Sequence, residues 1–205
     1  MVSAYNGESI PPEVSSAGGI GGMGLNMKEH QDLESLFQKH GYTDFRWIEP
    51  KDIVVAQWVR LKCTFGCGEY GRNAACPPNV PSVEECRQFF REYGTAAVFH
   101  FHTSLEDPED RHAWSREINL GLLELESEVF LSGCHKAFLL FMDSCGICKK
   151  CAGVRGECKS PKLARPTPEA MAMDVYTTVR QYSLPIQVLK DYSETMDRYA
   201  FLMVE

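Results

Sequence analysis

Four cysteines stand close together in the segment SCGICKKCAGVRGECKSP, and we call Cys145, Cys148, Cys151 and Cys158 the downstream group. Gaps of two residues let successive sulfurs converge from one tight loop. Three cysteines at such gaps are what an iron-sulfur cubane needs on three of its corners. The fourth follows after six residues, a longer gap than in the ferredoxin run. The pattern predicts a 4Fe-4S cluster, with Cys158 as the ligand that departs from the ferredoxin spacing.

Zinc is the main alternative for the downstream group. A structural zinc site with four cysteines usually comes as two C-x2-C pairs separated by a longer loop, so three cysteines at successive two-residue gaps are less common for zinc. Unligated thiols are a third interpretation. The spacing favours iron-sulfur over both.

A second set of cysteines, the upstream group, comprises Cys63, Cys67 and Cys76 in the segment LKCTFGCGEYGRNAACPPNVPS. Glycines between them allow backbone amides to approach a metal centre closely. Three local thiols leave one metal position for Cys86, Cys134, a histidine, a carboxylate, water or substrate. The upstream group could instead complete the downstream group in one shared site, or consist of buried unliganded thiols. We predict a second metal site, with a possible second cluster and an incomplete protein shell.

Two histidines alternate on a predicted strand. His100 and His102 therefore project from one face and can supply two metal ligands, although a histidine on a half-buried strand is more often a hydrogen-bonded residue. Tyr70 and Arg72, together with this histidine face, are candidates to line the opening of the upstream site.

Basic residues surround the downstream cysteines on an otherwise acidic chain of net charge -7. Nearby cations would raise the potential of an anionic cluster and could steer an acidic redox partner. The alternative is a solvated loop whose charges keep it soluble. Between residues 145 and 165 only Glu157 opposes these cations, which are Lys149, Lys150, Arg155, Lys159, Lys162 and Arg165.

Composition and cysteine usage bound the class of protein. The N-terminal residues lack a positively charged start and an apolar core, so no secretory signal is expected. An odd number of cysteines, nine, in clusters suits metal binding in the cytoplasm better than a disulfide framework. No apolar run is long enough for a membrane span, and the negative charge argues against nucleic acid as a partner. No hydrolase or nucleotide-binding motif is present.

Apolar periodicity and capping residues predict the elements that position these sites. Helices are expected at 28–40, after Ser82 with Glu85 as a capping box, at 108–132 and at 167–182. Strands are expected at 52–61, 96–102, 136–142, 185–189 and 198–204. The pattern predicts an α/β (or α+β) sandwich with a mixed sheet of about five strands, helices packed on it and both cysteine groups in loops leaving strands. Residues 1–26 are expected to be a flexible leader before a single metal-binding domain at 27–205.

The motifs also suggest a family. C-x3-C-x2-Y-G-x4-C-P-P, then C-x2-C-x2-C with a fourth cysteine, and then ARPTPEAM before DVYTTV, resemble a family of predicted metal-binding proteins of anaerobic bacteria and archaea. The likeness covers about residues 45–205 and includes both cysteine groups but not Cys86 or Cys134. It implies an iron-sulfur or other metal-binding protein and supplies no reaction.

These observations together predict a 4Fe-4S protein in electron transfer or redox chemistry with a protein redox partner. One alternative is a metalloenzyme in which an open iron of the upstream site binds a small substrate. Another is a protein with structural zinc, or a carrier of a metal or cluster.

Overall fold

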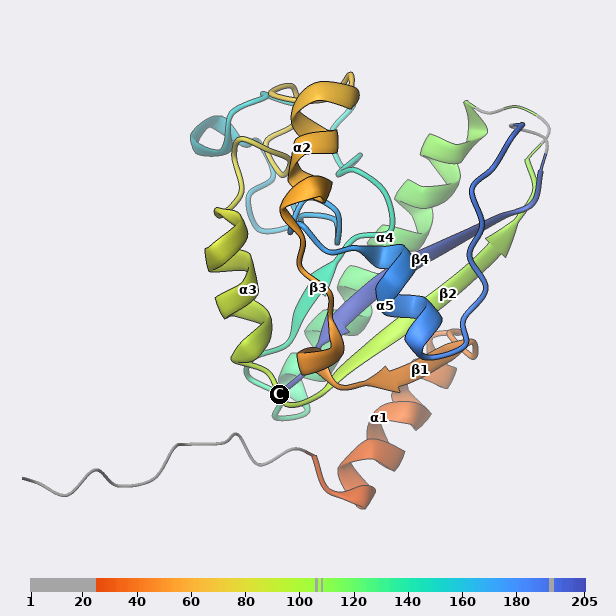
Figure 1. The fold of residues 1–205 in the computed structure, drawn as a ribbon. Helices are drawn as coiled ribbons and strands as arrows, with labels where there is room; N and C mark the ends of the chain where they lie inside the picture. Colours follow the sequence, from red (N-terminus) through yellow and green to blue (C-terminus); the bar gives the residue numbers. More distant parts are fainter. Residues whose placement is uncertain (1–24, 106, 108, 192–193) are drawn as a thin grey trace, which may run out of the picture.

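The structure is a computed structural model of the chain and describes residues 25–105, 107, 109–191 and 194–205. The predicted leader at 1–26 lies almost wholly outside these residues. The described elements are helices α1 (Met27–Lys39), α2 (Gln57–Gly66), α3 (Val83–Arg91), α4 (Asp110–Leu131) and α5 (Val175–Gln181), strands β1 (Phe45–Ile48), β2 (Ala96–Thr103), β3 (Phe138–Leu140) and β4 (Met196–Met203), and 3-10 turns η1 (Pro50–Asp52) and η2 (Arg155–Glu157). Figure 1 shows their arrangement.

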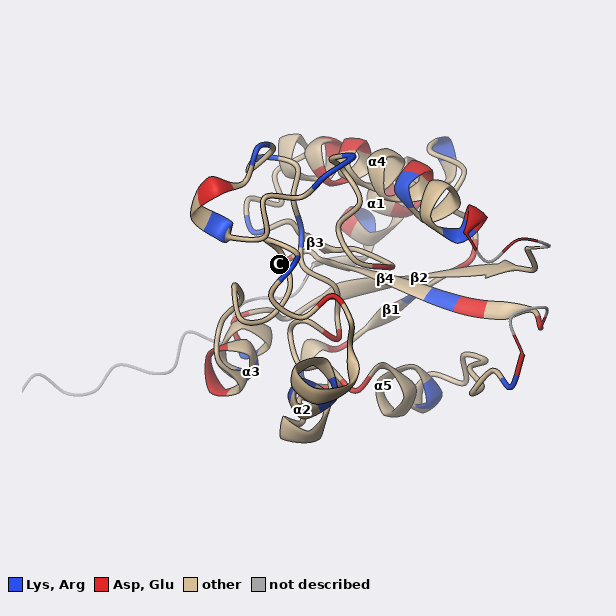
Figure 2. Cartoon of the chain, turned by 90° about the horizontal axis from the view of Figure 1, so that it is seen from above, with Lys and Arg blue, Asp and Glu red and all other residues tan. Residues whose placement is uncertain are grey.

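One sheet organises the described chain. Its strand order is β1-β2-β4-β3, and every neighbouring pair is antiparallel. Helices α1 and α4 cover one face, while α2, α3 and α5 lie on the other (Figure 2). The mixed helix and strand class is confirmed, and the described residues form four strands, all antiparallel, where a mixed sheet of about five was expected.

Each face of the sheet has its own apolar core. Leu33 and Phe37 of α1 pack with Leu122 and Leu125 of α4 against Phe99 on one face. On the other face the core lies between strand side chains and the helices α3 and α5, with members Cys86, Phe90, Val98, Val175, Val179 and Phe201. Alternation of side chains along β2 and β4 supplies both cores, as a period of two requires.

Several predicted elements are confirmed. The helix after Ser82 has the predicted capping box, in which the Ser82 side chain accepts from the Glu85 amide and the Glu85 carboxylate accepts from the Ser82 amide. The predicted strands at 96–102 and 198–204 are β2 and β4, and the run at 136–142 contains the shorter β3.

The strand predicted at 52–61 is wrong, because residues 57–66 form helix α2 after the turn η1. Only Val55 pairs, in an isolated bridge with Met173. Residues that do not pair with a neighbouring strand can satisfy their backbone hydrogen bonds within a helix. The β propensity of a segment is too weak a preference to prevent it from forming a helix.

Two further predictions fail near the C-terminus. Residues 185–189 form no strand, since β4 already has β2 and β3 on its two sides and β1 occupies the edge next to β2. The helix predicted from Thr167 begins only at Val175, where the Asp174 carboxylate accepts from the Thr177 amide. Turns at 168–172 precede it and include Ala172 with a φ of 60°.

Edge strand β3 is covered by side chains of α4. The backbone N–H of Leu139 donates to the Glu126 carboxylate at 2.7 Å, and the N–H of Met142 donates to the Asn119 side-chain oxygen at 3.1 Å. Both acceptors are buried. They satisfy amides that an edge strand would otherwise leave unpaired, and so fix the point at which the chain enters the downstream cysteine loop.

Candidate metal centre

The downstream cysteines lie in a loop, residues 142–165, that is closed at its base. The N–H of Phe141 donates to the Pro166 carbonyl at 2.9 Å, so the two ends of the loop lie side by side. Arg165 donates from Nε and Nη2 to the two oxygens of Glu126 at 3.0 and 2.8 Å. This mostly buried bidentate pair holds the end of the loop to helix α4.

All four downstream cysteines line one small hollow together with residues 73–75. The N–H of Ala74 donates to Cys151 Sγ at 3.3 Å, and the Ser160 hydroxyl lies 3.4 Å from Cys148 Sγ. Burial raises the pKa of the Cys145 thiol. Hydrogen bonds with the backbone amides of Ile147 and Arg165 have the opposite effect and lower this pKa. Hydrogen-bond donors aimed at sulfur are the surroundings that stabilise a thiolate.

The upstream cysteines come from a helix end and a loop. Cys63 and Cys67 lie about one turn apart at the C-terminal end of α2, and Cys76 precedes a cis peptide bond between Pro77 and Pro78. Helix α2 positions Cys63, in place of the predicted strand.

The electrostatics of the upstream group place its thiols close together. Burial raises the pKa of Cys76 to about 12, and the charges of Cys63, Cys67 and Cys145 add to the effect. Burial and then the Cys67 charge also raise the pKa of Cys63. Such thiols keep their protons at neutral pH unless a cation compensates the thiolate charge, as a bound metal does.

A hollow of about 270 Å³ opens beside Cys63 and Cys67. One wall is the side of α2 and the other is the segment 169–176, and the lining is mainly apolar, with Trp58, Val59, Lys62, Cys63, Cys67, Glu169, Met173, Asp174, Val175 and Tyr176. Tyr70, Arg72, His100 and His102, the residues predicted to line an opening here, are not among them. The Glu169 side chain is accessible to solvent, yet the protein around it desolvates the carboxyl enough to raise its pKa.

Two asparagines join the cysteine loops. Asn73 donates to the Cys145 carbonyl at 2.9 Å and accepts from the Ala75 amide at 2.9 Å. Asn79 donates to the Gly153 carbonyl at 2.8 Å and accepts from the Arg155 amide at 3.2 Å. Sequence reasoning missed both residues, although their positions on either side of Cys76 in a Gly- and Pro-rich segment were a usable signal.

Cys86 and Cys134 are set apart from both groups. Cys86 has no exposed surface and contacts Met171, and Cys134 is 8% exposed within the core on the α4 side. Cys86, a candidate for the open metal position in the sequence, is instead buried on helix α3. Neither thiol lines the two hollows described above.

The cysteine thiols suit a thiolate-bound metal. The distances between the sulfurs and the volume of the downstream hollow bear on how large that metal centre can be. A tetrahedral zinc with Zn–S bonds of about 2.3 Å needs sulfurs about 3.8 Å apart, yet in the described residues no three cysteine sulfurs lie within 4.8 Å of one another. The hollow itself holds about 10 Å³, about one water molecule, so a cubane requires the loop to move outward.

Most of the Lys and Arg residues around the downstream group are exposed to solvent. Lys149, Lys150, Arg155, Lys159 and Lys162 are exposed, and Figure 2 shows these basic segments at the cysteine-loop end of the molecule. Arg165 is the exception, because Glu126 neutralises it. Its role is to anchor the loop.

The comparison with protein families agrees with this picture. The family model described as predicted metal-binding protein (DUF2284) matches residues 46–204, which hold both cysteine groups and the whole sheet except Phe45. The chain belongs to this family. No curated protein sequence and no solved structure gives a significant match.

Membership of the DUF2284 family supports a metal ligand for this chain without naming the metal. The hollow of about 10 Å³ is lined by four thiols, and the hollow of about 270 Å³ is lined by two thiols and the carboxylates of Glu169 and Asp174. Within the described residues, no helix combines the length and apolar character needed to cross a membrane.

Proposed function

We propose that this protein is an iron-sulfur protein that transfers electrons, with a 4Fe-4S cluster held by Cys145, Cys148, Cys151 and Cys158. The observation that carries the proposal is the convergence of these four thiols, from one closed loop, on one hollow with an amide N–H directed at sulfur. The C-x2-C-x2-C spacing of the first three thiols favours a cubane over a structural zinc site.

Such a cluster, when bound, supplies a one-electron couple. The protein's own groups then set how readily it is reduced. The N–H of Ala74 and the amides that face Cys145 stabilise negative charge on sulfur. The exposed Lys149, Lys150 and Lys159 add positive potential at the surface and favour an acidic redox partner. We assign this function to the cytoplasm, where free thiols persist.

The upstream group supports a second function in the same molecule. Cys63, Cys67 and Cys76 provide three thiols, and the hollow of about 270 Å³ beside them leaves room for a small molecule at an open metal position. In this proposal the apolar wall of α2 and residues 173–176 exclude water, and Lys62 and Glu169 supply polar contacts to the bound molecule.

Anaerobic purification with quantitation of iron, sulfide and zinc tests the metal assignment directly. We expect a brown protein with about four irons and four sulfides per chain for one cubane, or about eight of each for two. EPR of the reduced protein should show a cluster signal. Stoichiometric zinc without sulfide, in a colourless protein, would contradict the proposal and favour the structural zinc or carrier alternative.

An open position in the upstream site has a separate test. Titration with cyanide should change the EPR spectrum of the wild-type protein and leave that of Cys76→Ala unchanged. A wild-type spectrum indifferent to cyanide, together with iron near four per chain, leaves a single electron-transfer cluster and removes the second function.

A further inference from the structure

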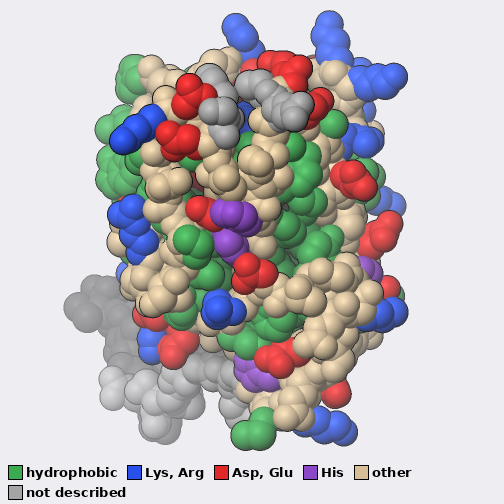
Figure 3. All heavy atoms as spheres, turned by 90° about the vertical axis from the view of Figure 1, so that its right-hand side faces the viewer, with side chains coloured by type: hydrophobic (Ala, Val, Ile, Leu, Met, Phe, Trp, Pro, Cys, Tyr) green, Lys and Arg blue, Asp and Glu red, His purple; other side chains and the backbone are tan. Residues whose placement is uncertain are grey.

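A group of polar side chains stands apart from the cysteines, at the outer ends of β2 and β4. His102 and Asp197 are directly opposite in the antiparallel register, and His100 lies two residues earlier on the same face. The side chains of His100 and Asp197 are each 8% exposed, whereas that of His102 is 63% exposed. Figure 3 shows histidine and acidic side chains meeting at the surface of the molecule.

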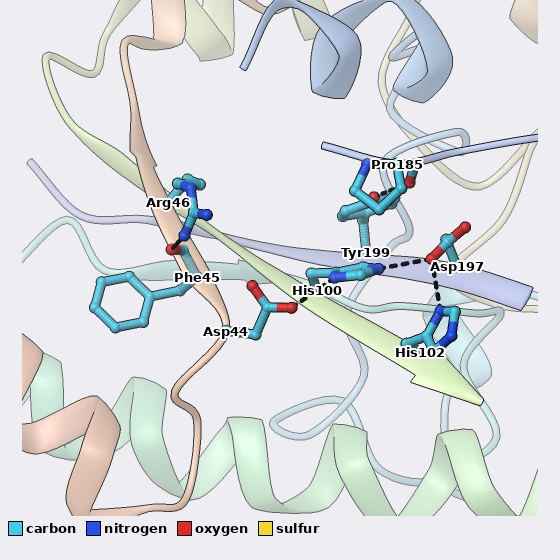
Figure 4. A network of polar contacts seen from close by, with 8 residues as sticks. All are labelled: Asp44, Phe45, Arg46, His100, His102, Pro185, Asp197 and Tyr199. Atoms are coloured by element: carbon cyan, nitrogen blue, oxygen red, sulfur yellow. Dashed lines mark hydrogen bonds and ion pairs between the residues drawn. The ribbon is translucent and has the colours of Figure 1, made fainter. Parts of the chain in front are cut away.

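Three potential ligand atoms converge in this group. Asp197 Oδ1 lies 2.8 Å from His100 Nε2 and 2.9 Å from His102 Nδ1 (Figure 4). Within the described residues, one set of three His, Cys, Asp or Glu side chains brings its ligand atoms within 4.8 Å of one another, and it is this one. Ligands at about 2.1 Å from a tetrahedral metal lie about 3.4 Å apart, so Asp197 Oδ1 has to move about half an ångström from each ring nitrogen to admit an ion.

A second carboxylate orients the first histidine. Asp44 Oδ2 lies 2.7 Å from His100 Nδ1, on the side of the ring away from Asp197. The Tyr199 ring stacks on His100 with a centroid distance of 5.0 Å and an interplanar angle of 19°, and the Tyr199 hydroxyl donates to the Pro185 carbonyl. A carboxylate that accepts from the far nitrogen is the usual support of a metal-binding histidine.

The hydrogen-bonding pattern itself calls for a cation. His100 has a carboxylate oxygen at each ring nitrogen, so its ring either carries two protons or carries one proton on Nδ1 and a metal on Nε2. Two carboxylates with two neutral imidazoles carry a charge of -2, which a divalent ion balances.

We propose that His100, His102 and Asp197 bind one divalent first-row transition-metal ion, with Asp44 as the carboxylate that orients His100. Two imidazoles and one carboxylate suit ions such as Zn²⁺, Fe²⁺ or Co²⁺. Three protein ligands leave positions open to water or a small ligand on the exposed His102 side. The site contains no cysteine and does not depend on what the thiols bind.

Cobalt binding to the full-length, anaerobically purified protein tests the proposal. Equilibrium dialysis against Co²⁺ with metal analysis should give one more ion per chain for the wild type than for His102→Ala. His102 is mostly exposed, so its removal should leave the fold intact. Asp197→Asn keeps an oxygen that accepts from the histidines but loses the charge, and it should weaken binding at least tenfold. Asp44→Asn should weaken it by about tenfold to a hundredfold.

The matched control is His135→Ala, whose side chain is 74% exposed and lies outside the group. All variants keep every cysteine, so cobalt bound by thiols cancels in the comparison. Weak-field d–d absorption without sulfur-to-cobalt charge transfer, in the difference between wild type and His102→Ala, would identify nitrogen and oxygen ligands. Equal cobalt content and affinity in wild type, His102→Ala and Asp197→Asn would overturn the proposal and leave a hydrogen-bonded network with a doubly protonated His100.

Discussion

The downstream cysteines come from one loop closed at its base, whereas the upstream cysteines come from the end of α2 and a separate loop beside a hollow of about 270 Å³. In the downstream loop, amides and a hydroxyl face the sulfurs, and all four thiols are partly buried. In the upstream group one thiol, Cys67, is exposed. The contrast is the basis of our proposal that the downstream site holds a cofactor and the upstream site is open to exchange.

Burial acts on both groups in the same direction. Desolvation is the largest cause of the raised pKa values of Cys63, Cys76 and Cys145, so each site is poor at holding thiolates by itself. The two groups differ in the contacts that lower the thiol pKa values and oppose the effect of burial. Backbone amides face Cys145, while Arg60 is the cation that lowers the pKa of Cys63. Without a metal, burial thus favours the protonated thiol at Cys63, Cys76 and Cys145.

Removing a downstream thiol should have the largest effect, and it tests whether the downstream group holds a cluster. Cys148→Ala should lower iron and sulfide by about four atoms each per chain, because a cubane loses one corner of its protein shell. The buried Cys86→Ala is the matched control and should leave metal content unchanged. Iron and sulfide that stay constant in Cys148→Ala would show that the four-cysteine loop holds no cluster.

A second test concerns the anchor of the closed loop. Arg165→Ala leaves the Glu126 carboxylate buried without its cation, and we expect a loss of about 3–5 kcal/mol in the free energy of unfolding. Lys162→Ala, at an exposed position in the same loop, should change stability by less than about 0.5 kcal/mol. Denaturant unfolding of both variants measures the difference, and similar values for the two would remove the anchoring role.

The elements around these sites could be predicted to different degrees. Capping by Ser82 and Glu85 and the alternation along β2 are local signals, and both predictions are confirmed, while the sites predicted from the spacing of the cysteines stay predictions. Helix α2, strand β1 and the late start of α5 depend on which sheet edges are free, and this is settled by tertiary pairing. For the same reason the sequence indicated His100 and His102 but not Asp197, because the register between β2 and β4 joins residues far apart in the chain.

The link between the two groups should be weaker than the anchor. Asn73→Ala leaves the Cys145 carbonyl and the Ala75 amide without their partner in a buried position, so a loss of about 1–3 kcal/mol is expected. The loss should be larger in the metal-loaded protein than in the metal-free protein, because the metal orders the loop that Asn73 contacts. Exposed Gln38→Ala serves as the control. An equal loss with and without metal would mean that the two loops are not coupled through the metal site.

The smallest expected effect is a change in how often the closed loop opens. Residues 143–165 bury few large apolar groups, so without metal little offsets the entropy of ordering them. Chelation should speed tryptic cleavage at the exposed Lys149, Lys150 and Arg155 on the order of tenfold, equivalent to about 1.4 kcal/mol in the opening equilibrium. Cleavage at Lys190, which is exposed in a segment outside both cysteine groups, should keep its rate.

Since the upstream thiols Cys63 and Cys67 lie at the end of helix α2, which has backbone hydrogen bonds of its own, cleavage at Lys62 should respond less than cleavage in the downstream loop. Equal acceleration at Lys62 and Lys149 would instead indicate that one shared site orders both groups, and the distinction between a closed and an open site would no longer hold.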